Sequence, residues 1–396
     1  MRVTFVVQRY GAGIAGGAET HCRAFAIRLA RAGHDITVVT SRARSYTTWA
    51  NEMPEGSSLE DGVTVRRLST RFERDVSFFA PMSTRVLIGR CPPPRHVQRR
   101  WLEVQGPVLE GFDTELDSIA RTADVVVFFT YLYWPTVVGL DTLVGRVPLV
   151  LHPTAHDELS FHLPFVRTTL HLPDAFAFST PEERALVATK VPIPEPSAVV
   201  GVGVDIDDSD LNAPAARSIV GLSDRPYVLA VGRVDASKGA HELAAFFATY
   251  KLRRPGPLAL VIAGDPVQPV PAHPDVIQMG VVDERTKHGL YRGAEVVVVP
   301  SFFESFSMVL TEAWVHGRPA LVQGRCDVLA GQVGRSKGGL AYRGYAEFET
   351  ALDLLLARTD IADALGEKGR AYTNANYTWP AVLGRYVDLL ERVAGH

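Results

Sequence analysis

The sequence predicts an α/β protein made of two domains, each a parallel sheet covered by helices on both faces. Three observations support this prediction. The chain has 396 residues, which is more than one ordinary hydrophobic core accommodates. Short apolar segments recur in both halves of the chain, and segments with helical periodicity separate them. Continuous apolar strands that alternate with helices are typical of parallel sheets buried on both faces.

The first half of the chain contains six apolar segments that predict strands. Between the first two, residues 17–32 carry apolar side chains at helical spacing and end before Gly33, which predicts a helix. Residues 70–120 are less regular, with three consecutive prolines and many arginines, and no elements are predicted there. The predicted strands are residues 3–7, 36–40, 63–68, 125–129, 149–151 and 175–178.

The alternation of strands and helices starts again at residue 227 and predicts a second, Rossmann-like domain. Residues 199–205 lie between the two halves and are interpreted as a hinge. The predicted strands are residues 227–231, 258–263, 276–279, 296–299 and 320–322. The predicted helices are residues 239–250, 284–292, 306–316, 345–357 and 360–374, followed by an amphipathic C-terminal helix at 379–393.

The composition excludes several classes of protein. The formal net charge is −3, whereas a nucleic-acid-binding domain would be strongly basic. Cys22, Cys91 and Cys326 lie far apart and form no CxxC, so we expect neither disulfides nor a zinc site, and a cytoplasmic location. The N-terminus shows no signal-peptide pattern, and no apolar run reaches the ~20 residues of a membrane-spanning helix.

The most informative stretch lies between Ser301 and Pro319. An apolar strand leads into a loop that carries Glu304, and a helix follows that carries Glu312. Helix N-termini attract phosphate groups, and ligands bind at the C-terminal ends of strands in open α/β sheets. Carboxylates in such a place can accept hydrogen bonds from sugar hydroxyls. The stretch therefore predicts a site for a ligand with phosphate and sugar groups.

A second motif follows the predicted strand at residues 227–231. Gly232 and Gly239 bound a turn that carries Arg233 and Lys238. An arginine and a lysine five residues apart can close on one diphosphate from two sides, and charge-assisted hydrogen bonds of this kind are strong. Either motif alone could consist of surface charges. The two together, each after a strand and in this order, favour a nucleotide-diphosphate site.

The two motifs resemble those of the retaining glycosyltransferases of family 4, namely Gly-Arg-x4-Lys-Gly and Glu-x7-Glu. The loop Gly16-Gly17-Ala18-Glu19 also resembles the Gly-Gly-Ala-Glu loop of that family. The resemblance implies the GT-B fold, in which two Rossmann-like domains face each other across a cleft and a C-terminal helix crosses back to the N-terminal domain. It implies an acceptor-binding domain at residues 1–203 plus 378–396 and a donor-binding domain at residues 204–377.

The resemblance implies transfer of a hexose from a nucleotide-diphosphate sugar to a hydroxyl group, with retention at the anomeric carbon. Glucose or mannose linked to UDP or GDP is the expected donor, and a saccharide, a lipid or a small molecule is the expected acceptor. No metal ion is expected, because Arg233, Lys238 and a helix N-terminus can stabilise the diphosphate. Front-face attack is the working hypothesis, since no nucleophilic side chain is evident opposite the donor.

The resemblance also assigns roles to individual residues. Glu304 would bind hydroxyls of the donor sugar, Glu312 would bind the ribose, and the base would stack near Val281. The glycines would let the backbone approach the phosphates. The predicted catalytic residues are Glu304, His156, His152, Arg233 and Lys238, and the predicted donor-binding residues are Gly16, Gly17, Gly232, Arg233, Lys238, Val281, Phe306, Ser307, Met308 and Glu312.

Two positions leave alternatives open. The loop after residues 149–151 holds both His152 and His156, and either can be the histidine that contacts the donor sugar in the family. His156 is preferred because an acidic residue follows it. The family has glycine where this chain has Ser307, whose Cβ disfavours positive φ. Its hydroxyl is expected to cap the helix or, alternatively, to alter the choice of sugar.

Other functions remain as alternatives. The segment from Gly11 through Gly13 to Gly16 matches G-x-G-x-x-G, and Arg42 and Arg44 follow the second strand, which would suit an NADP-dependent oxidoreductase. A nucleotide-sugar epimerase with the GT-B fold would change the donor without any acceptor. A non-catalytic sugar-binding or nucleotide-binding module is the third alternative.

Two charged segments have simpler interpretations. Residues 205–210 match the Asp-x-Asp pattern of a metal site twice but are interpreted as a solvated turn. The basic and partly apolar run from Arg85 to Trp101 is interpreted as a solvated face. Its alternatives are contact with a charged acceptor and peripheral contact with anionic lipid at the inner face of the membrane.

Overall fold

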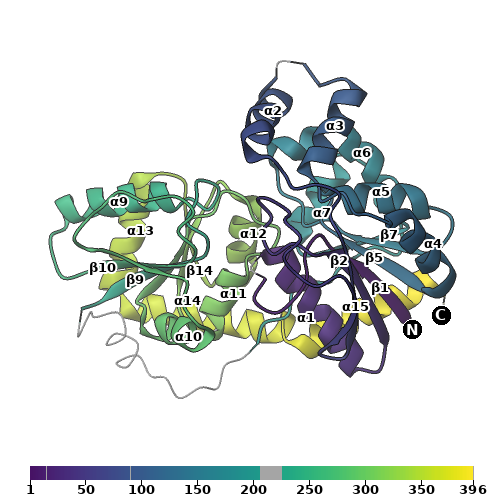
Figure 1. The fold of residues 1–396 in the computed structure, drawn as a ribbon. Coiled ribbons are helices and arrows are strands. Elements are labelled where there is room, and N and C mark those ends of the chain that lie inside the picture. The colour runs from purple at the N-terminus through teal and green to yellow at the C-terminus, as the bar shows by residue number, and fades with distance from the viewer. Residues whose placement is uncertain (15, 90, 206–224, 396) are drawn as a thin grey trace. The chain divides into compact units, whose positions relative to one another are not determined.

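The computed structural model describes residues 1–14, 16–89, 91–205 and 225–395, and it divides into two compact units (Figure 1). Unit 1 consists of Met1–Gly201 and Leu383–His396, and unit 2 consists of Val202–Val382. The sequence had placed the boundaries at 203/204 and 377/378, within a few residues of this division.

Unit 1 is built on an eight-stranded sheet with the order β3-β4-β2-β1-β5-β6-β7-β8. Neighbouring strands are parallel except for β3 and β4, which form an antiparallel edge hairpin. Because β1 lies between β2 and β5, the strand order reverses there, and the C-terminal ends of these strands form a topological switch point. The strands are β1 (Arg2–Val6), β2 (Asp35–Ser41), β3 (Gly56–Glu60), β4 (Val63–Leu68), β5 (Val125–Phe129), β6 (Leu149–His152), β7 (Ala175–Phe178) and β8 (Ala198–Val199).

The helices of unit 1 include three in the segment that the sequence left without elements. α2, α3 and α4 occupy most of residues 76–122, so that prediction was wrong. Asp75 caps α2 through its side chain, and Phe79 of α2 stacks on Trp101 of α3, so packing orders this segment despite its prolines. The helices are α1 (Gly17–Arg31), α2 (Val76–Ile88), α3 (Arg95–Gln105), α4 (Phe112–Thr122), α5 (Trp134–Leu143), α6 (Pro164–Leu170) and α7 (Pro181–Ala188), with a 3-10 turn η1 (Leu159–His162).

Unit 2 has a six-stranded, fully parallel sheet with the order β11-β10-β9-β12-β13-β14. Alternate side chains of β9 enter different cores: Tyr227 and Leu229 lie in one hydrophobic cluster, and Val228 and Ala230 lie in the other. This burial on both faces explains why the strands read as continuous apolar runs. The strands are β9 (Tyr227–Val231), β10 (Ala259–Ala263), β11 (Val276–Gly280), β12 (Val296–Val299), β13 (Ala320–Gln323) and β14 (Gly339–Tyr342).

The helices of unit 2 cover both faces of this sheet, as predicted. The sequence missed β14 and α12, which follow β13 (Figure 1). The helices are α9 (Ala240–Arg253), α10 (Glu284–Gly293), α11 (Met308–Val315), α12 (Asp327–Ser336), α13 (Tyr345–Ala357) and α14 (Thr359–Asn376).

The C-terminal helix α15 (Trp379–Ala394) is divided between the units, since its residues from Leu383 onward belong to unit 1. Within unit 1, the ring of Tyr386 packs 4.3 Å from the ring of Phe25, centroid to centroid. This confirms the predicted return of the C-terminus to the first domain. In the described ranges, no helix is both long and apolar enough to cross a membrane.

Candidate functional site

Two loops of unit 2 meet where β9 and β12 end side by side. The backbone N–H of Phe302 donates to the carbonyl of Ser237 at 3.0 Å. Gly239 has a φ of +69°, and a Cβ at this position would lie 2.1 Å from the carbonyl oxygen of Pro300. Only glycine permits this approach. The glycine that ends the Gly-Arg-x4-Lys-Gly turn is therefore the residue that lets the two loops come into contact.

This contact brings together the two charged residues that the motifs single out. The Nζ of Lys238 lies 2.7 Å from the Oε1 of Glu304. The two side chains are 31% and 14% exposed, so the pair is partly desolvated yet can be reached from solvent. A cation and a carboxylate that were 66 residues apart in sequence thus share one site at the switch point of the sheet.

Asp235 organises the turn that carries these cations, a role that the sequence analysis missed. Its Oδ1 accepts hydrogen bonds from the backbone N–H of Lys238 at 2.9 Å and from the hydroxyl of Ser237 at 2.6 Å, and its Oδ2 accepts from Arg233. Burial acts against ionisation, but these hydrogen bonds prevail and lower the pKa of Asp235. An aspartate two residues before a serine in a glycine-bounded turn is a signal that could have identified this Asx turn.

Ser307 immediately precedes α11 and departs from its predicted role. It has a φ of +77°, and its side chain forms no capping hydrogen bond. The residue is 5% exposed, and its Oγ is buried without a partner among the described residues. The expectation that the hydroxyl caps the helix is therefore wrong, because a capping serine normally has an extended backbone and Ser307 is left-handed. Neighbouring Phe306 is also buried, and its carbonyl accepts a hydrogen bond from Gln332 of α12.

Glu312 lies inside α11 and is held by α10. Its Oε1 lies 3.0 Å from the Nζ of Lys287, and its Oε2 accepts a hydrogen bond from the hydroxyl of Tyr291 at 2.8 Å. Burial opposes the charge of Lys287, but Glu312 and Glu284 raise its pKa. Val281, predicted to lie near the base, follows β11 and is 77% exposed. Unit 2 therefore places its predicted diphosphate, sugar and ribose residues on loops and helices that follow its strands, whereas Gly16, Gly17 and His156 lie in unit 1.

The Gly-Gly-Ala-Glu loop of unit 1 contains a buried ion pair. The guanidinium of Arg9 contacts the Oε1 of Glu19 at 2.6 Å, and both side chains are almost fully buried. A Cβ on Gly16 would lie 2.2 Å from the carboxylate of Glu19, so the pair requires glycine there, whereas Gly17 has open space around it. The glycine at position 16 thus makes room for an internal ion pair.

The dinucleotide-binding alternative does not fit unit 1. β1 ends at Val6 and α1 begins only at Gly17, so Gly11 and Gly13 lie well before the helix N-terminus. The fingerprint needs its glycines at the turn from strand to helix. The side chain of Arg42 is bound to the carbonyl of Met53 rather than free for a 2′-phosphate.

The two candidate histidines lie in very different surroundings. His152 is fully buried and stacks on Phe129 with ring centroids 4.5 Å apart, and neither of its ring nitrogens has a partner among the described residues. Burial and the neighbouring His21 lower its pKa well below the ordinary value. Such a side chain does not suit contact with a substrate, so the assignment of His152 to the site is corrected.

His156 is partly exposed and lies 3.8 Å from the Oε1 of Glu158. The loop that carries it is held by Glu183 of α7, which accepts hydrogen bonds from the backbone N–H groups of Ala155 at 2.7 Å and Ser179 at 2.6 Å. Burial raises the pKa of Glu183 to about 7, although these hydrogen bonds oppose the shift. Of the two histidines, only His156 is placed where a ligand could reach it.

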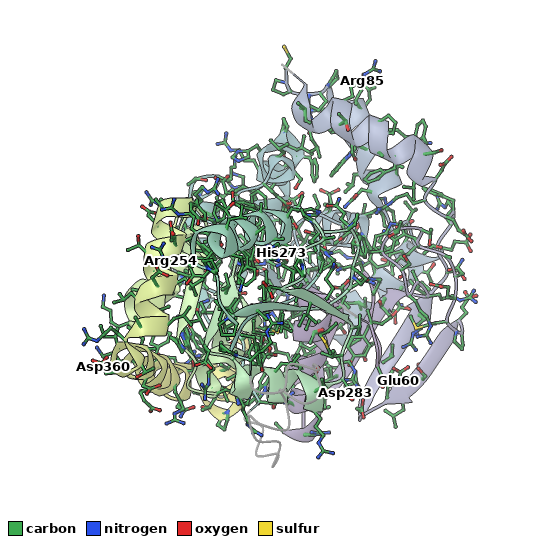
Figure 2. All side chains as sticks on the ribbon, turned by 90° about the vertical axis from the view of Figure 1, so that its left-hand side faces the viewer. Glu60, Arg85, Arg254, His273, Asp283 and Asp360 are labelled. Atoms are coloured by element: carbon green, nitrogen blue, oxygen red, sulfur yellow. The ribbon has the colours of Figure 1, made fainter. Side chains whose placement is uncertain are left out.

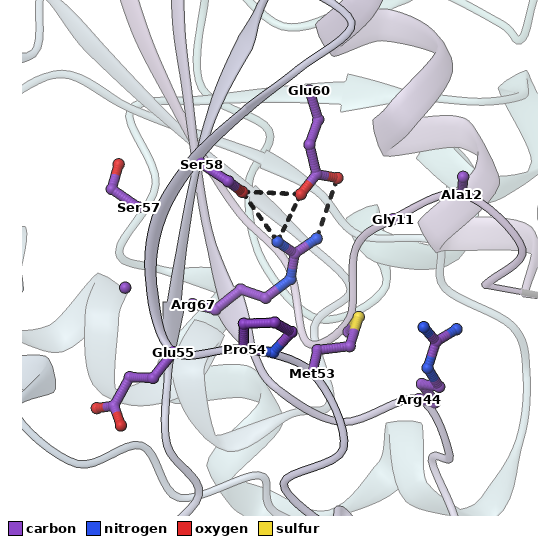
Figure 3. A pocket seen from close by; sticks show the side chains of 11 residues that line it. Gly11, Ala12, Arg44, Met53, Pro54, Glu55, Ser57, Ser58, Glu60 and Arg67 are labelled. Carbon is purple, nitrogen blue, oxygen red and sulfur yellow. Dashed lines mark hydrogen bonds and ion pairs between the residues drawn. The ribbon is translucent and has the colours of Figure 1, made fainter.

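A hollow of about 360 Å³ lies beside the β3–β4 hairpin of unit 1 (Figure 3). The guanidinium of Arg67 in its wall binds Glu60 at 2.5 Å and the hydroxyl of Ser58 at 3.1 Å. The charge of Arg67 is thus paired with Glu60, although its Nε is buried without a partner among the described residues. None of the predicted catalytic or donor-binding residues lines this hollow.

The run from Arg85 to Trp101 does not form one surface. Trp101 is buried between Phe79 and Phe165, so it cannot face a membrane, and this part of the prediction is corrected. Arg85 projects from the outer side of α2 (Figure 2), and Ile88 on the same helix is also exposed. All of the Asp-x-Asp segment except Asp205, that is residues 206–210, lies outside the described residues. Within the described ranges, no three His, Cys, Asp or Glu side chains cluster as metal ligands would.

Comparison with known proteins relates unit 2 to a protein family by sequence and the whole chain to solved structures by fold. Residues 225–357, within unit 2, match the protein family described as "Glycosyl transferases group 1". Over 185 residues the chain is 31% identical to D-inositol 3-phosphate glycosyltransferase of Nocardia farcinica. The aligned region covers 42% of this chain and 40% of the relative. The chain thus spans less than half the length of this curated relative.

Solved structures with the same fold cover the whole chain. Sucrose-phosphate synthase from Thermosynechococcus elongatus superposes with a TM-score of 0.74 and 19% identity, over 100% of this chain and 99% of that one. The Anabaena protein HepE, solved in complex with UDP-glucose, gives a TM-score of 0.71 and 15% identity, over 99% of this chain and 100% of that one. At these identities the likeness establishes the fold, which is GT-B, as the sequence predicted.

Proposed function

We propose that the protein is a glycosyltransferase that moves a hexose from a nucleotide-diphosphate sugar to an acceptor hydroxyl, with retention and without a metal ion. The observation that carries this proposal is the contact between Lys238 and Glu304 at the ends of β9 and β12, just before α11. A ligand with both phosphate charge and sugar hydroxyls needs a cation and a carboxylate within one small site. The family match of residues 225–357 supports the same conclusion.

Arg233 and Lys238 are the proposed diphosphate ligands. As the bond to the sugar breaks, negative charge grows on the departing diphosphate, and cations fixed beforehand stabilise that charge. Asp235 fixes both by holding the side chain of Arg233 and the backbone of Lys238. Removing one such group costs about 3–4 kcal/mol of transition-state stabilisation.

Glu304 is the proposed ligand of the donor sugar. Its contact with Lys238 keeps the carboxylate oriented toward the site. When a donor binds, Lys238 can turn to the diphosphate while Glu304 accepts hydrogen bonds from sugar hydroxyls. A carboxylate has lone pairs enough to keep one contact and accept another. Glu312 would bind the ribose in the same way while it remains bonded to Lys287 and Tyr291.

The proposed reaction is a front-face substitution at the anomeric carbon. The bond from this carbon to the β-phosphate oxygen breaks, and a bond to the acceptor oxygen forms on the same face. The acceptor proton passes to the departing phosphate oxygen, so atoms and charge balance without an enzyme nucleophile. His156 is the proposed contact to the donor sugar from unit 1.

The expected donor is UDP- or GDP-linked glucose or mannose, and the acceptor is a saccharide, a lipid or a small molecule. HepE was solved with UDP-glucose, which supports trying a uridine donor first. Peripheral contact with anionic lipid stays a secondary proposal that rests on exposed Phe78, Arg85 and Ile88 of α2. Sedimentation with vesicles, with and without phosphatidylglycerol, tests it: binding to neither kind contradicts it.

A donor assay tests the proposed activity. The protein is incubated with UDP-glucose, UDP-galactose, GDP-mannose and ADP-glucose, with and without EDTA, and released nucleoside diphosphate is measured with a mixture of sugar and polyol acceptors. The proposal expects release from one donor, dependent on acceptor and resistant to EDTA. Conversion of the donor to its epimer without acceptor would instead indicate an epimerase. Absence of release from every donor would contradict the proposal.

A further inference from the structure

A second group of polar side chains in unit 2 links the end of β13 to the helix that follows the Lys238 turn. Glu242 lies in the first turn of α9, and Gln323 and Arg325 lie at and just after the end of β13. Nη2 of Arg325 lies 2.7 Å from each carboxylate oxygen of Glu242. The amide of Gln323 donates to the same carboxylate at 2.8 Å and accepts from Nε of Arg325 at 3.2 Å. The three side chains, here called the Arg325 cluster, thus form a closed ring of hydrogen bonds.

The geometry of the Arg325 cluster is fixed by its buried member. Gln323 is fully buried, and both ends of its amide are hydrogen-bonded within the cluster. The side chains of Arg325 and Glu242 are 47% and 25% exposed. Ion pairs with this degree of exposure contribute little to the stability of a fold. The cluster therefore fixes the positions of two segments of the chain more than it stabilises them.

Arg325 also holds the loop that carries Glu304. Its guanidinium carbon lies 4.8 Å from the ring centroid of Phe302, two residues before Glu304. Planar guanidinium groups pack well on aromatic faces. The backbone N–H of Phe302 donates to the carbonyl of Ser237 in the Lys238 turn at 3.0 Å. Phe302 is thus held through its backbone by the Lys238 turn and through its ring by Arg325.

The segment after Arg325 contacts the same loop further along. Burial raises the pKa of the Cys326 thiol to about 11, and the carboxylate of Glu304 contributes to this shift, so the two groups lie within electrostatic reach of each other. The side chain of Gln332 in α12 donates to the carbonyl of Phe306. The loop from Phe302 to Phe306 therefore lies between the Lys238 turn and the segment that follows β13.

The reaction makes different demands on the two links between these segments. The ion pair of Lys238 and Glu304 joins the Lys238 turn directly to the Glu304 loop. In the proposed function, Lys238 turns to the diphosphate when the donor binds, and this direct link is then lost. The bond between Arg325 and Glu242 involves neither of these two donor ligands, so it can persist in the complex.

We propose that Arg325 and Glu242 keep Glu304 in place against the donor sugar after Lys238 has turned to the diphosphate. Arg325 is a positioning residue in this inference, since it acts on Glu304 through the ring of Phe302. The inference rests on the proposed function and adds two residues to the donor site, neither of which the motifs single out. Misplacement of a binding group by about 1 Å is enough to weaken its contribution strongly.

A comparison of two ligands tests this inference. The whole protein is titrated by calorimetry with UDP and UDP-glucose, and with GDP and GDP-mannose, without acceptor. Arg325→Gln should weaken the preferred nucleotide sugar at least ~5-fold through misplaced Glu304, and should change the affinity for the nucleoside diphosphate less than ~2-fold. Glu242→Ala should have the same effect as Arg325→Gln. Arg358→Gln, which breaks an exposed pair with Asp360 in the same unit, is the matched control and should change neither affinity.

A double variant tests whether Arg325 acts through Glu304. In a Glu304→Gln background, Arg325→Gln should weaken the nucleotide sugar by less than ~2-fold more, because the carboxylate that it positions is already absent. The melting temperature of Arg325→Gln should stay within about 4 °C of the wild type, since the pair is partly exposed.

Three results would overturn the inference. They are an unchanged affinity for the nucleotide sugar in Arg325→Gln, an equal loss of affinity for the nucleotide and the nucleotide sugar, and a full additional loss in the Glu304→Gln background. Failure of the proposed function has a different signature. A wild-type protein that binds a nucleotide sugar but releases no nucleoside diphosphate in the donor assay would contradict the transferase activity, and the comparison of ligands would still decide the role of Arg325.

Discussion

The sheets of the two units have the same kind of topological switch point, but the charged residues beside it differ. In each, the first strand lies inside the sheet, so strand order reverses beside it: β1 lies between β2 and β5, and β9 lies between β10 and β12. In unit 2, Lys238 pairs with Glu304 at the switch point. In unit 1, Arg9 pairs with Glu19, both almost fully buried, and Arg74 has no carboxylate partner among the described residues.

This difference indicates that the topology of the sheet determines where a ligand binds. The sign and exposure of the charges there determine which kind of ligand can bind. Partly exposed charges of both signs, as in unit 2, can exchange their contact with each other for contacts with a ligand. The fully buried pair of unit 1 cannot exchange its contact for contacts with a ligand without a large free-energy cost, because each buried charge would be left unpaired. The four predictions that follow test this contrast.

The largest expected effect concerns the buried pair of unit 1. Glu19→Ala leaves Arg9 buried without its counter-charge and should lower the free energy of unfolding by about 3–5 kcal/mol. Asp61→Ala removes the partner of Arg23 in a partly exposed pair and should lower it by less than ~1 kcal/mol. Urea unfolding measures both. Equal, small effects would show that the Arg9–Glu19 pair is not structural.

The second prediction concerns the partly exposed pair of unit 2, Lys238 and Glu304. Glu304→Gln should leave stability nearly unchanged but reduce turnover at least ~100-fold, because the donor sugar loses a charged acceptor. Glu367→Gln, at an exposed position of α14, is the matched control and should keep wild-type turnover. Steady-state kinetics with the donor found in the release assay measure the ratio. Near-wild-type turnover in Glu304→Gln would remove Glu304 from the site.

The third prediction concerns pH. Burial lowers the pKa of His21 to about 3 and that of His152 well below its ordinary value. Their stabilising contribution is complete above about pH 6.5 and is lost as the pH falls, since the unfolded chain then binds the extra protons. Each histidine should cost about 1.4 kcal/mol per pH unit below that value.

Glu183 acts in the opposite sense over the same range, because its pKa of about 7 makes the folded state hold a proton that the unfolded state has lost. The measurement therefore compares the pH dependence of the unfolding free energy between a histidine variant and the wild type, so that the contribution of Glu183 cancels. His152→Leu should flatten the slope of unfolding free energy against pH, between pH 6 and 5, by about 1.4 kcal/mol per unit relative to wild type. His96→Gln, an exposed control, should not. An unchanged slope in His152→Leu would mean that His152 titrates normally.

The smallest expected effect concerns Ser307. Glycine relieves a positive φ and removes a buried hydroxyl without a partner, so Ser307→Gly should raise the free energy of unfolding by about 1 kcal/mol. Thermal unfolding of the two proteins measures the change. Lower stability would show that the hydroxyl has a structural partner.

The sequence predicted most of unit 2 because its strands are short, apolar and buried on both faces. It also predicted that the Lys238 turn and the Glu304 loop serve one ligand site, but not the ion pair that joins Lys238 to Glu304. It missed α2 and α3, where the prolines suggest irregular structure but Asp75 and aromatic stacking order the chain. Helix periodicity is a weak guide where tertiary packing decides.

Side-chain environments were the least predictable feature. The acidic residue after His156 favoured it over His152, but nothing in the local sequence indicated that His152 is buried among aromatic rings. Arg74 likewise looks like the other arginines of its segment, and only packing against Trp49 and Phe79 reveals its burial. Burial of a single polar side chain depends on neighbours distant in sequence, which periodicity and motif spacing do not encode.

Nucleotide binding tests the central claim, that unit 2 holds a nucleoside diphosphate through Arg233 and Lys238, most directly. Thermal unfolding is followed with UDP, GDP, ADP and NADP, each with and without EDTA, for the wild type and Lys238→Ala. A ligand at 100 times its dissociation constant adds about 2.7 kcal/mol of stability. The account predicts stabilisation by one nucleoside diphosphate that survives EDTA and is lost in Lys238→Ala. Stabilisation by NADP alone, or equal stabilisation of both proteins, would contradict it.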